Sequence, residues 1–527
     1  MESMTKPESA AGVEAAEAAS NGKPDPDSFE VRRPTDGTVI DTIAVASAED
    51  VAATVARMRE AQREWEAIGF PGRRHWLEKL RDWMLDNQDR LDDLMQAESG
   101  KVRADAALEC FYCLDAINFW VERGPKFLAD EVVQPHLTLL RAKRAKVVYR
   151  PFGVVGIISP WNFPVILSLG DALPALVAGN AVAIKPSELT PLTLMEIVRG
   201  WREELGAPDV LAVVNGMGET GGALVDESDY VQFTGSERTG KIVMKRAAET
   251  LTPVSLELGG KDPMIVTRGA DVERAANATA FGGLLNTGQI CISIERVYVE
   301  EPIYDEFVEK LRAKVEELRQ GDDSDSHYTS ELGAMTSPAQ TEIVSSHVED
   351  AREAGARILT GGKRKDGPGE WYEPTLIADA DHSMRVMREE TFGPVIPVMK
   401  VKDVEEAIEL ANDTKYGLGS SVFAGDAEEG ERIARRIDAG HCNVNDVLVN
   451  YNVLGLPMGG WKSSGIGVRH GAQGIRRFCH TEALTIPRLP QPKSEPLWYP
   501  YGPRQRGLVR RLYRFLSARG VRNRIGL

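Results

Sequence analysis

Residues 154–186 read VVGIISPWNFPVILSLGDALPALVAGNAVAIKP. The segment opens with the short apolar run VVGIISP, passes through a helical pattern near residues 165–178 and closes with a second apolar run, AVAIKP. Short apolar runs on either side of a helical pattern are typical of neighbouring parallel strands that helices cover on both faces. This segment therefore predicts a β–α–β unit, the building block of an α/β fold.

The same alternation continues along the chain. Before the quoted segment, residues 48–128 show the 3.6-residue apolar period of long amphipathic helices. After it, helical patterns near residues 191, 238, 271–285 and 302 separate further strand-like runs. These runs are VLAVVNG (210–216), YVQFTGS (230–236), PVSLELGG (253–260), MIVTRG (264–269), RVYVEE (296–301), VIPVMKV (395–401), SVFAGD (421–426) and NVNDV (443–447). The pattern predicts two α/β lobes, each built on a parallel sheet.

The composition is that of a globular protein. Lysine and arginine number 63 against 79 acidic residues, so the net charge is −16, and 42% of the 527 residues are apolar. A net negative charge argues against a protein that binds nucleic acid over its whole surface. Five cysteines are too few for a disulfide framework, which favours a reducing compartment.

The sequence predicts neither a secretory signal peptide nor a membrane-spanning helix. The acidic, alanine-rich residues 1–29 lack the basic-then-apolar order of a signal peptide and are expected to form a disordered tail. The most apolar region, roughly residues 152–184, is interrupted by proline, asparagine and aspartate, whereas a spanning helix needs about 20 apolar residues. A cytoplasmic protein is expected.

The C-terminal segment has a different character. Residues 503–527 contain eight arginines and no acidic residue, and Leu508, Leu512, Phe515 and Leu516 share one helical face. Such a basic amphipathic helix could lie at the surface of an anionic membrane, giving a peripheral contact. It could instead be a solvated tail, or pack on an acidic surface of its own oligomer.

Two glycine turns could each receive the pyrophosphate of a dinucleotide. The segment GMGETG at residues 216–221 fits the G-x-G-x-x-G fingerprint, and FTGS at residues 233–236 also precedes a helix. The residues alone do not decide between them. Lys185 and Glu188 follow a buried-type strand and could hold a ribose diol, or form a solvent-exposed pair.

Cys291 and Glu257 are the candidate reactive groups. Each stands in or beside a glycine-containing turn, in NTGQIC (286–291) and ELGGK (257–261). A thiol nucleophile and a carboxylate base are the groups needed for covalent attack on a carbonyl and later activation of water. The other cysteines are expected to be structural, and no histidine, cysteine or acidic cluster has the spacing of a metal site.

Taken together, these segments resemble the NAD(P)-dependent aldehyde dehydrogenase superfamily over roughly residues 30–488. The matching strings are PWNFP (160–164), KPSELTPLT (185–193), FTGSERTG (233–240), ELGGKDP (257–263), NTGQIC (286–291), EETFGPV (389–395), YGLGSSVF (416–423) and PMGGWKSSG (457–465). Within that superfamily the chain is most similar to bacterial proteins often labelled succinate-semialdehyde dehydrogenase.

The resemblance implies catalytic roles. Cys291 matches the nucleophile that forms a thiohemiacetal and then a thioester, and Glu257 matches the base that activates water. Asn162 matches the side chain that stabilises the oxyanion. Because Glu257 is present, hydrolysis to a free acid is favoured over transfer to coenzyme A. A non-catalytic, membrane-bound scaffold is the rival hypothesis, and these three intact residues argue against it.

The resemblance also implies the cofactor contacts. Lys185 and Glu188 match the adenosine-ribose contacts, and Gly235 with Ser236 matches the pyrophosphate turn. Further matches are Trp161 in the cofactor site, Gly216 beside the adenine, Glu390 on the nicotinamide ribose and Phe392 near the nicotinamide. Glu188 would repel a 2′-phosphate, so NAD is favoured and NADP stays possible.

The implied substrate pocket is apolar. Its expected lining is Leu167, Gly170, Leu285, Ile290, Ile292, Leu456 and Met458. Succinate-semialdehyde enzymes hold the substrate carboxylate with arginines at the positions of Leu285 and Gly170, and a carboxylate desolvated without a cation is costly. A medium- or long-chain aliphatic or an aromatic aldehyde is therefore expected. The alternative is succinic semialdehyde, with Arg296 or Arg469 supplying the charge.

The family's subunit implies a division of the chain. A cofactor domain is expected from residues 30–135 and 152–257, and a catalytic domain from 258–455. An oligomerisation arm is expected from residues 136–151 and 470–489, followed by a basic tail over 490–527. Exposed strand edges in the arm need a partner, which predicts a homodimer or homotetramer.

One departure from the family predicts a buried contact. Many relatives have a lysine and a glutamate at the positions of Asp171 and Arg469, so the two charges are exchanged in this chain. We therefore expect an Asp171–Arg469 ion pair below the active site.

Overall fold

The computed structural model describes residues 27–324, 327–491, 493–495, 498–499, 501–520 and 524. Most of the predicted N-terminal tail lies outside the described residues, and strand β1 (Ser28–Arg32) already begins within the range expected for that tail. The chain forms two compact units. The first contains the residues up to Ala129 together with Tyr149–His480, and the second contains Asp130–Val148 and Thr481–Leu527.

A six-stranded sheet forms one half of the first unit. Its order is β17 (Gly465–Ile466), β9 (Val254–Glu257), β8 (Tyr230–Thr234), β5 (Val154–Ile158), β6 (Ala181–Lys185) and β7 (Leu211–Val213). Apart from β17, which runs antiparallel to β9, the strands are parallel. The segment at residues 154–186 forms β5, helix α6 (Leu169–Ala178) and β6, so the predicted β–α–β unit is confirmed.

A seven-stranded sheet forms the other half. Its order is β12 (Arg357–Thr360), β13 (Thr375–Ala378), β14 (Val395–Val401), β11 (Ile294–Glu300), β10 (Asp262–Val266), β15 (Ser421–Phe423) and β16 (Asn443–Val444). Its strands are parallel except for the edge strand β12. Two parallel-sheet lobes are thus confirmed. The chain passes from one sheet to the other between Glu257 and Asp262.

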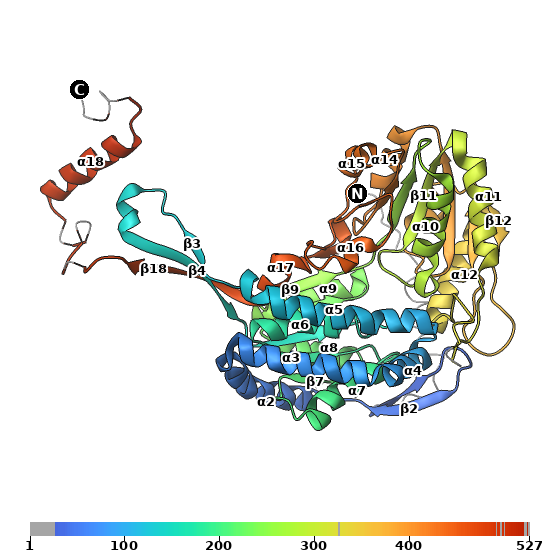
Figure 1. Cartoon of the computed structure of the whole chain (residues 1–527), viewed down its shortest axis with the longest axis horizontal. Coiled ribbons are helices and arrows are strands. Elements are labelled where there is room, and N and C mark those ends of the chain that lie inside the picture. The colour runs from blue at the N-terminus through green and yellow to red at the C-terminus, as the bar shows by residue number, and fades with distance from the viewer. Residues whose placement is uncertain are drawn as a thin grey trace, which may run out of the picture. The chain divides into compact units, whose positions relative to one another are not determined.

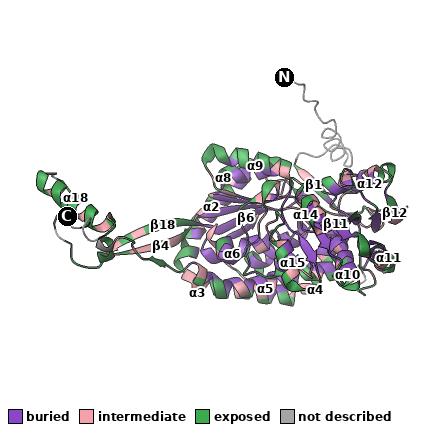
Figure 2. Ribbon diagram, turned by 90° about the horizontal axis from the view of Figure 1, so that it is seen from above, coloured by how far each residue is buried: buried purple, intermediate pink, exposed green. Residues whose placement is uncertain are grey.

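Helices cover both sheets, and the strands between them are buried (Figures 1 and 2). Around the first sheet they are α2 (Ala48–Ala67), α3 (Gly69–Asp86), α4 (Gln88–Ser99), α5 (Arg103–Phe127), α6, α7 (Leu192–Arg199), α8 (Gly218–Glu227) and α9 (Glu237–Thr250). Around the second they are α10 (Val272–Leu284), α11 (Glu301–Glu317), α12 (Pro338–Glu353), α13 (Arg385–Arg388), α14 (Val404–Asn412), α15 (Ala427–Ala434) and α16 (Val449–Asn452).

The amphipathic pattern of the N-terminal helices explains their packing. Helix α2 begins with a capping box in which Ser47 and Asp50 satisfy each other's backbone N–H groups. It buries Val51, Val55 and Trp65 on one face, where they join the core under the first sheet. Propensity alone would leave such a helix marginal, so this apolar face is what holds it in place.

The second unit is a small β structure followed by a helix. Strands β3 (Glu131–Val133), β4 (Lys143–Pro151) and β18 (Cys479–Pro487) form a three-stranded sheet in the order β18–β4–β3. Helix α18 (Pro503–Ser517) follows. Among the described residues, no helix combines the length and apolar character needed to cross a bilayer.

The boundaries of the arm differ from those expected. Residues 471–476 were placed in the arm, but they form helix α17 (Gly471–Arg476) of the first unit. This helix packs on α5 and α6, and the side chain of Ile475 is fully buried there. At the other end of the arm, β3 begins before residue 136. Burial of Ile475 therefore ties this segment to the core rather than to the arm.

Candidate active site

A cavity of about 270 Å³ lies where the carboxyl ends of strands β5, β8 and β9 meet the second lobe. Ligands of parallel sheets bind in such positions because successive strand-to-helix loops converge there. Its lining residues are Pro160, Trp161, Asn162, Leu167, Thr234, Gly235, Ser236, Glu257, Leu258, Gly259, Cys291, Gln340, Ile343, Glu390 and Phe392. The structure thus brings all three candidate catalytic residues into one cavity with five of the eight candidate cofactor residues.

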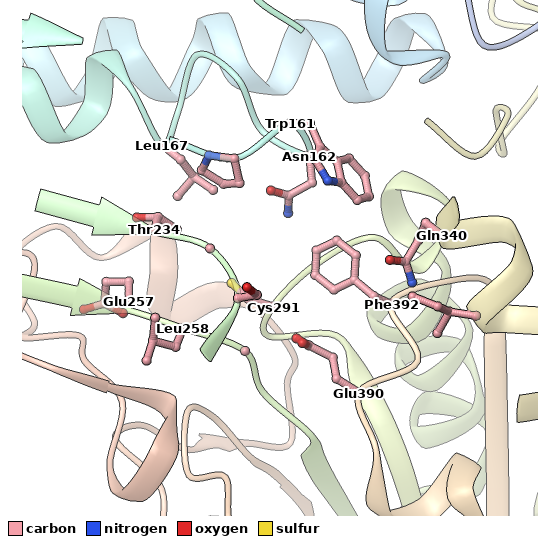
Figure 3. Close-up of a pocket in the computed structure, with 15 residues that line it drawn as sticks. Trp161, Asn162, Leu167, Thr234, Glu257, Leu258, Cys291, Gln340, Glu390 and Phe392 are labelled. Atoms are coloured by element: carbon pink, nitrogen blue, oxygen red, sulfur yellow. The ribbon is translucent and has the colours of Figure 1, made fainter. Parts of the chain in front are cut away.

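Asn162 and Cys291 come from opposite walls of this cavity. Figure 3 shows the Asn162 side chain reaching toward Cys291, with Glu257 on one side of the cysteine and Glu390 on the other. The Asn162 carboxamide donates a hydrogen bond of 2.9 Å to the carbonyl oxygen of Gln289. This bond fixes the carboxamide beside the loop that bears the nucleophile.

A turn of unusual conformation presents Cys291. Asn286, Thr287 and Gly288 have φ of 51°, 56° and 71°, and a Cβ at Gly288 would lie 2.1 Å from the Gly393 carbonyl oxygen. Left-handed conformations of residues other than glycine cost free energy and persist only where the surroundings impose them. Here the Asn286 carboxamide donates to the Asn162 carbonyl oxygen at 3.0 Å. The turn that precedes Cys291 is therefore joined directly to the loop that bears Asn162.

A buried cluster at the start of α5 supports both loops. The Lys101 ammonium donates to the Asn162 carbonyl oxygen at 3.0 Å and pairs with Glu109 at 2.5 Å. Glu109 in turn accepts from the backbone N–H groups of Val165 and Ile166. Asp105 accepts from the Asn286 N–H at 3.1 Å, and burial raises the pKa of Asp105 to about 6. The sequence analysis missed this cluster, because nothing in the local sequence links it to residues 162 and 286.

The environment of Cys291 keeps its thiol protonated. Ile290, Ile292, Leu418 and Met458 form an apolar cluster against which Cys291 packs. Burial, opposed by Arg469 and assisted by nearby carboxylates, raises the pKa of the Cys291 thiol to about 12. The thiolate is the attacking form, so this residue needs a proton acceptor in the cavity.

Glu257 is the carboxyl group best suited to that task. It ends strand β9, and its Oε1 atom has no hydrogen-bond partner among the described residues. Burial raises the pKa of Glu257 to about 7, with Arg469 and Arg477 lowering it and Asp171 raising it. A carboxyl that titrates near neutral pH can both accept and release a proton during turnover.

The expected Asp171–Arg469 ion pair is confirmed. The Arg469 guanidinium donates to both carboxylate oxygens of Asp171, at 3.1 and 2.8 Å, and both side chains are buried. Arg477 adds a third bond to Asp171 at 2.9 Å, and Arg469 also donates to the Thr234 hydroxyl. Two guanidinium groups and one carboxylate thus lie close enough to Glu257 to affect its pKa.

A second buried network holds the loop of Glu390 and Phe392. Glu295 accepts from the backbone N–H groups of Thr391 and Phe392, both at 2.8 Å, and pairs with Lys261 at 2.6 Å. Phe392 has φ of 52°, and its ring meets Trp161 edge to face at 5.4 Å. Glu390 accepts from the Gly260 N–H at 3.0 Å. Burial and the neighbouring Glu295 raise the pKa of Glu390 to about 8.

The two glycine turns occupy different places. Gly235 and Ser236 line the cavity, and Ser236 caps helix α9 by accepting from the Thr239 N–H. Gly216 lies ahead of α8, whereas Gly221, the last glycine of the same fingerprint, lies within α8 beside Lys185: a Cβ at Gly221 would lie 3.5 Å from the Lys185 side chain. The turn at 233–236 is thus the one beside Cys291.

Lys185 is the last residue of strand β6, and Glu188 follows it in the next loop. The Lys185 ammonium donates to the Pro186 carbonyl oxygen at 2.8 Å and approaches the Glu188 carboxylate at 3.4 Å. Lys185 is largely buried, whereas the Glu188 side chain is 39% exposed. Neither residue lines the cavity at Cys291.

The candidate substrate residues are distributed unevenly. Ile290, Ile292 and Met458 are buried, Leu285 packs against their cluster, and Leu167 lines the cavity itself. Gly170 does not line the cavity, and a Cβ there would lie 3.1 Å from the Tyr112 ring, so Tyr112 occupies the space beside this glycine. Leu456 is 52% exposed and lines neither the cavity nor the cluster.

Comparisons with known proteins agree with this geometry. The model of the "Aldehyde dehydrogenase family" matches residues 22–484. The chain belongs to the aldehyde dehydrogenase family. It is therefore an oxidoreductase that acts on aldehydes, and the expected family and fold class are confirmed.

Three relatives illustrate the range of the family. A Mycolicibacterium smegmatis protein named "Putative succinate-semialdehyde dehydrogenase [NADP(+)]" is 42% identical over 86% of this chain and 87% of its own length. A Methylomonas protein named "4,4'-diapolycopene aldehyde oxidase" is 40% identical over 89% of this chain and 87% of its own length. The crystal structure of an NAD-dependent aldehyde dehydrogenase from Sinorhizobium meliloti aligns with a TM-score of 0.83 and 34% identity, over 88% of this chain and 92% of that one.

Proposed function

We propose that this aldehyde dehydrogenase oxidises an apolar aldehyde to a carboxylic acid with NAD(P) as acceptor, through a thiohemiacetal and a thioester on Cys291. The observation that supports this most is the meeting of Cys291, Glu257 and Asn162 in one cavity. A nucleophile, a base and an oxyanion donor are the protein groups that covalent catalysis at a carbonyl requires, and NAD(P) would supply the hydride acceptor.

The residues divide the work as follows. Cys291 attacks the carbonyl carbon, and its proton passes to Glu257, a carboxylate that lines the same cavity. The Asn162 carboxamide donates to the oxygen that becomes negative, and Lys101 holds the Asn162 backbone so that the donor stays in place. A bound NAD(P)⁺ would supply the hydride acceptor that this oxidation requires. After releasing the first proton to solvent, Glu257 takes a proton from the water that attacks the thioester, the carboxylic acid leaves, and the Cys291 thiolate is regenerated.

The residues present fit a dinucleotide. Helix α9 points its N-terminus, with Gly235 and Ser236, into the cavity, where backbone N–H groups favour a pyrophosphate. Glu390 and Phe392 would hold the nicotinamide end, and Lys185 with Glu188 the adenosine ribose. The half-exposed Glu188 carboxylate would repel a 2′-phosphate, so we propose NAD as the preferred acceptor, although one relative is named for NADP⁺.

The apolar surroundings of Cys291 support an apolar substrate. Leu285 occupies the position at which succinate-semialdehyde enzymes have a carboxylate-binding arginine. The two arginines that could replace it, Arg296 and Arg469, already bind other groups of the protein. Arg296 donates to the carbonyl oxygens of Lys261, Leu410 and Ala411, while Arg469 is bound to Asp171. The Methylomonas relative is named for an apolar aldehyde. Oxidation of succinic semialdehyde is the alternative, which the name of the Mycolicibacterium relative supports.

The test is NADH formation by the purified protein with a long-chain aldehyde, an aromatic aldehyde and succinic semialdehyde, with Cys291→Ser as control. We expect activity with the two apolar aldehydes and none in the control. A clear preference for succinic semialdehyde would overturn the substrate assignment. Full activity of Cys291→Ser would overturn the catalytic assignment, whereas no activity of the parent protein with any of the three aldehydes would favour the scaffold hypothesis.

The β arm supports an oligomer. In the three-stranded sheet of the second unit, β18 and β3 are the outer strands, and every residue of β3 is exposed. Open strand edges pair readily with another chain. We propose a homodimer or homotetramer assembled through this sheet, which light scattering on a chromatographed sample would test. A monomer at micromolar concentration would refute it.

A further inference from the structure

Helix α18 (Pro503–Ser517) is amphipathic, with its charged and apolar residues on opposite faces. On a helix with 3.6 residues per turn, its arginines fall on one side and its apolar residues on the other. The arginines are Arg504, Arg506, Arg510, Arg511 and Arg514, and the apolar residues are Leu508, Val509, Leu512, Phe515 and Leu516. No residue of this helix is buried. An apolar face left at the surface of a protein generally marks an interaction site.

The charge around the helix has one sign. The last acidic residue of the chain is Glu495, and eight arginines follow it. Without these arginines the net charge of the chain would fall from −16 to −24. The positive charge of this end is therefore a local feature of a strongly acidic protein, and it favours a partner with a dense negative surface.

Aromatic residues lie just ahead of the helix. Trp498, Tyr499 and Tyr501 are 59%, 78% and 71% exposed, and the rings of Tyr499 and Tyr501 are 4.6 Å apart. Tryptophan and tyrosine combine an apolar ring with a polar atom, which suits them to the boundary between lipid headgroups and acyl chains. Three such side chains lie next to an arginine-rich amphipathic helix. Both the aromatic residues and the helix are therefore suited to a lipid interface.

We propose that α18 and the aromatic residues Trp498, Tyr499 and Tyr501 dock this enzyme on the surface of an anionic lipid bilayer. The apolar face enters the boundary of the acyl chains, and the arginines meet the lipid phosphates. The helix lies on the membrane and does not cross it, because a 15-residue helix with five arginines is too short and too charged to span. An enzyme bound in this way would meet aldehydes that partition into lipid.

Two other partners would use only part of these features. A nucleic acid would engage the arginines but gain little from the leucines and Phe515. An acidic surface on a second copy of the chain would use the arginines and bury the apolar face, but it would leave no role for the exposed aromatic segment. The bilayer alone uses the arginines, the apolar face and the aromatic residues together.

The test is sedimentation of the full-length protein with vesicles, measured without turnover so that it does not depend on the aldehyde substrate. We expect binding to phosphatidylcholine vesicles containing about 30 mol% phosphatidylglycerol, little binding to pure phosphatidylcholine, and release at high salt. The double variants Leu512→Asp/Phe515→Asp and Arg510→Glu/Arg511→Glu should each weaken binding about tenfold or more. Leu489→Asp, an exposed leucine outside the helix, is the matched control and should bind like the parent protein.

Three results would overturn the proposal. The first is absence of binding to anionic vesicles by the intact enzyme. The second is binding that depends on the arginines but not on Leu512 and Phe515, with equal affinity for RNA, which would indicate a general polyanion site. The third is a change of oligomeric state in Leu512→Asp/Phe515→Asp without any loss of vesicle binding, which would place the helix between subunits.

Discussion

Replacing Glu257 by glutamine separates the catalytic role of this residue from its structural cost. Glutamine keeps the shape of the side chain but cannot accept a proton. If Glu257 is the base for thioester hydrolysis, steady-state turnover of Glu257→Gln should fall by about 10² to 10⁴, the usual contribution of a general base. The assay is NADH formation with a saturating apolar aldehyde, followed into the steady state. Glu353→Gln, on the exposed surface of α12, is the matched control and should keep full activity.

The pH dependence follows from the pKa of Glu257. With a pKa of about 7, the ionised fraction rises from about one tenth at pH 6 to about nine tenths at pH 8. Turnover limited by hydrolysis should therefore rise about tenfold across this interval in the parent enzyme. In Glu257→Gln the residual rate should lose this step. A parent profile that is flat from pH 6 to about pH 8 would contradict the assignment.

The same substitution should stabilise the fold at high pH. Because burial raises the pKa of Glu257 above its value in the unfolded chain, the folded protein binds the proton more tightly, and stability is lost as pH rises toward 7. A shift from 4.5 to about 7 corresponds to about 3 kcal/mol, most of it developed between pH 5 and pH 8. The free energy of unfolding of Glu257→Gln relative to the parent should therefore rise by about 2 to 3 kcal/mol over that interval, measured by urea denaturation. A difference that stays constant with pH would refute the argument.

Three further substitutions test the supporting residues. Lys101→Met leaves Glu109 buried without its cation, so urea denaturation should show a loss of about 3 to 5 kcal/mol, while exposed Lys363→Met should lose less than about 0.5 kcal/mol. Glu188→Ser removes the charge opposed to a 2′-phosphate and should raise kcat/KM for NADP⁺ relative to NAD⁺ about tenfold; an unchanged ratio would show that Glu188 does not select the acceptor. Leu285→Arg places a cation beside the apolar cluster and should shift kcat/KM toward succinic semialdehyde over hexanal about tenfold, and no shift would mean that residue 285 does not face the substrate.

The sheets could be predicted because their strands are buried on both faces. Such strands appear in the sequence as uninterrupted apolar runs, and runs such as residues 154–158 and 181–185 became β5 and β6. The arm was harder to delimit. Residues 471–476 precede β18 without a clear break in composition, and only the burial of Ile475 against α5 and α6 shows that they belong to the first unit.

The active-site cavity depends on residues that the sequence could predict and on residues that it could not. Cys291, Glu257 and Asn162 stand in motifs, and the Asp171–Arg469 pair could be inferred because two charges are exchanged together. Lys101 could not be found in this way. Its contact with Asn162 spans 61 positions and ends on a backbone carbonyl oxygen, which leaves no complementary side chain in the sequence.

Backbone conformation is equally hidden. Asn286, Thr287 and Phe392 all have positive φ without being glycine, and tertiary contacts rather than local preference impose it. Gly170 shows the same limit from the other side. A glycine suggests free space beside the backbone, but Tyr112 of helix α5 fills the space at Gly170. The sequence around residue 170 gives no sign of this contact.

The two carboxyl groups of the cavity, Glu257 and Glu390, differ in the charged residues that surround them and shift their pKa values. Burial raises the pKa of both Glu257 and Glu390. Glu257 then faces Arg469 and Arg477, which pull its pKa back to about 7, whereas Glu390 faces Glu295, which pushes its pKa to about 8. The neighbouring charges therefore act in opposite senses: the two arginines favour the ionised form of Glu257, and Glu295 favours the protonated form of Glu390. A protonated carboxyl can donate as well as accept a hydrogen bond, which suits a group that binds a ribose rather than one that moves a proton.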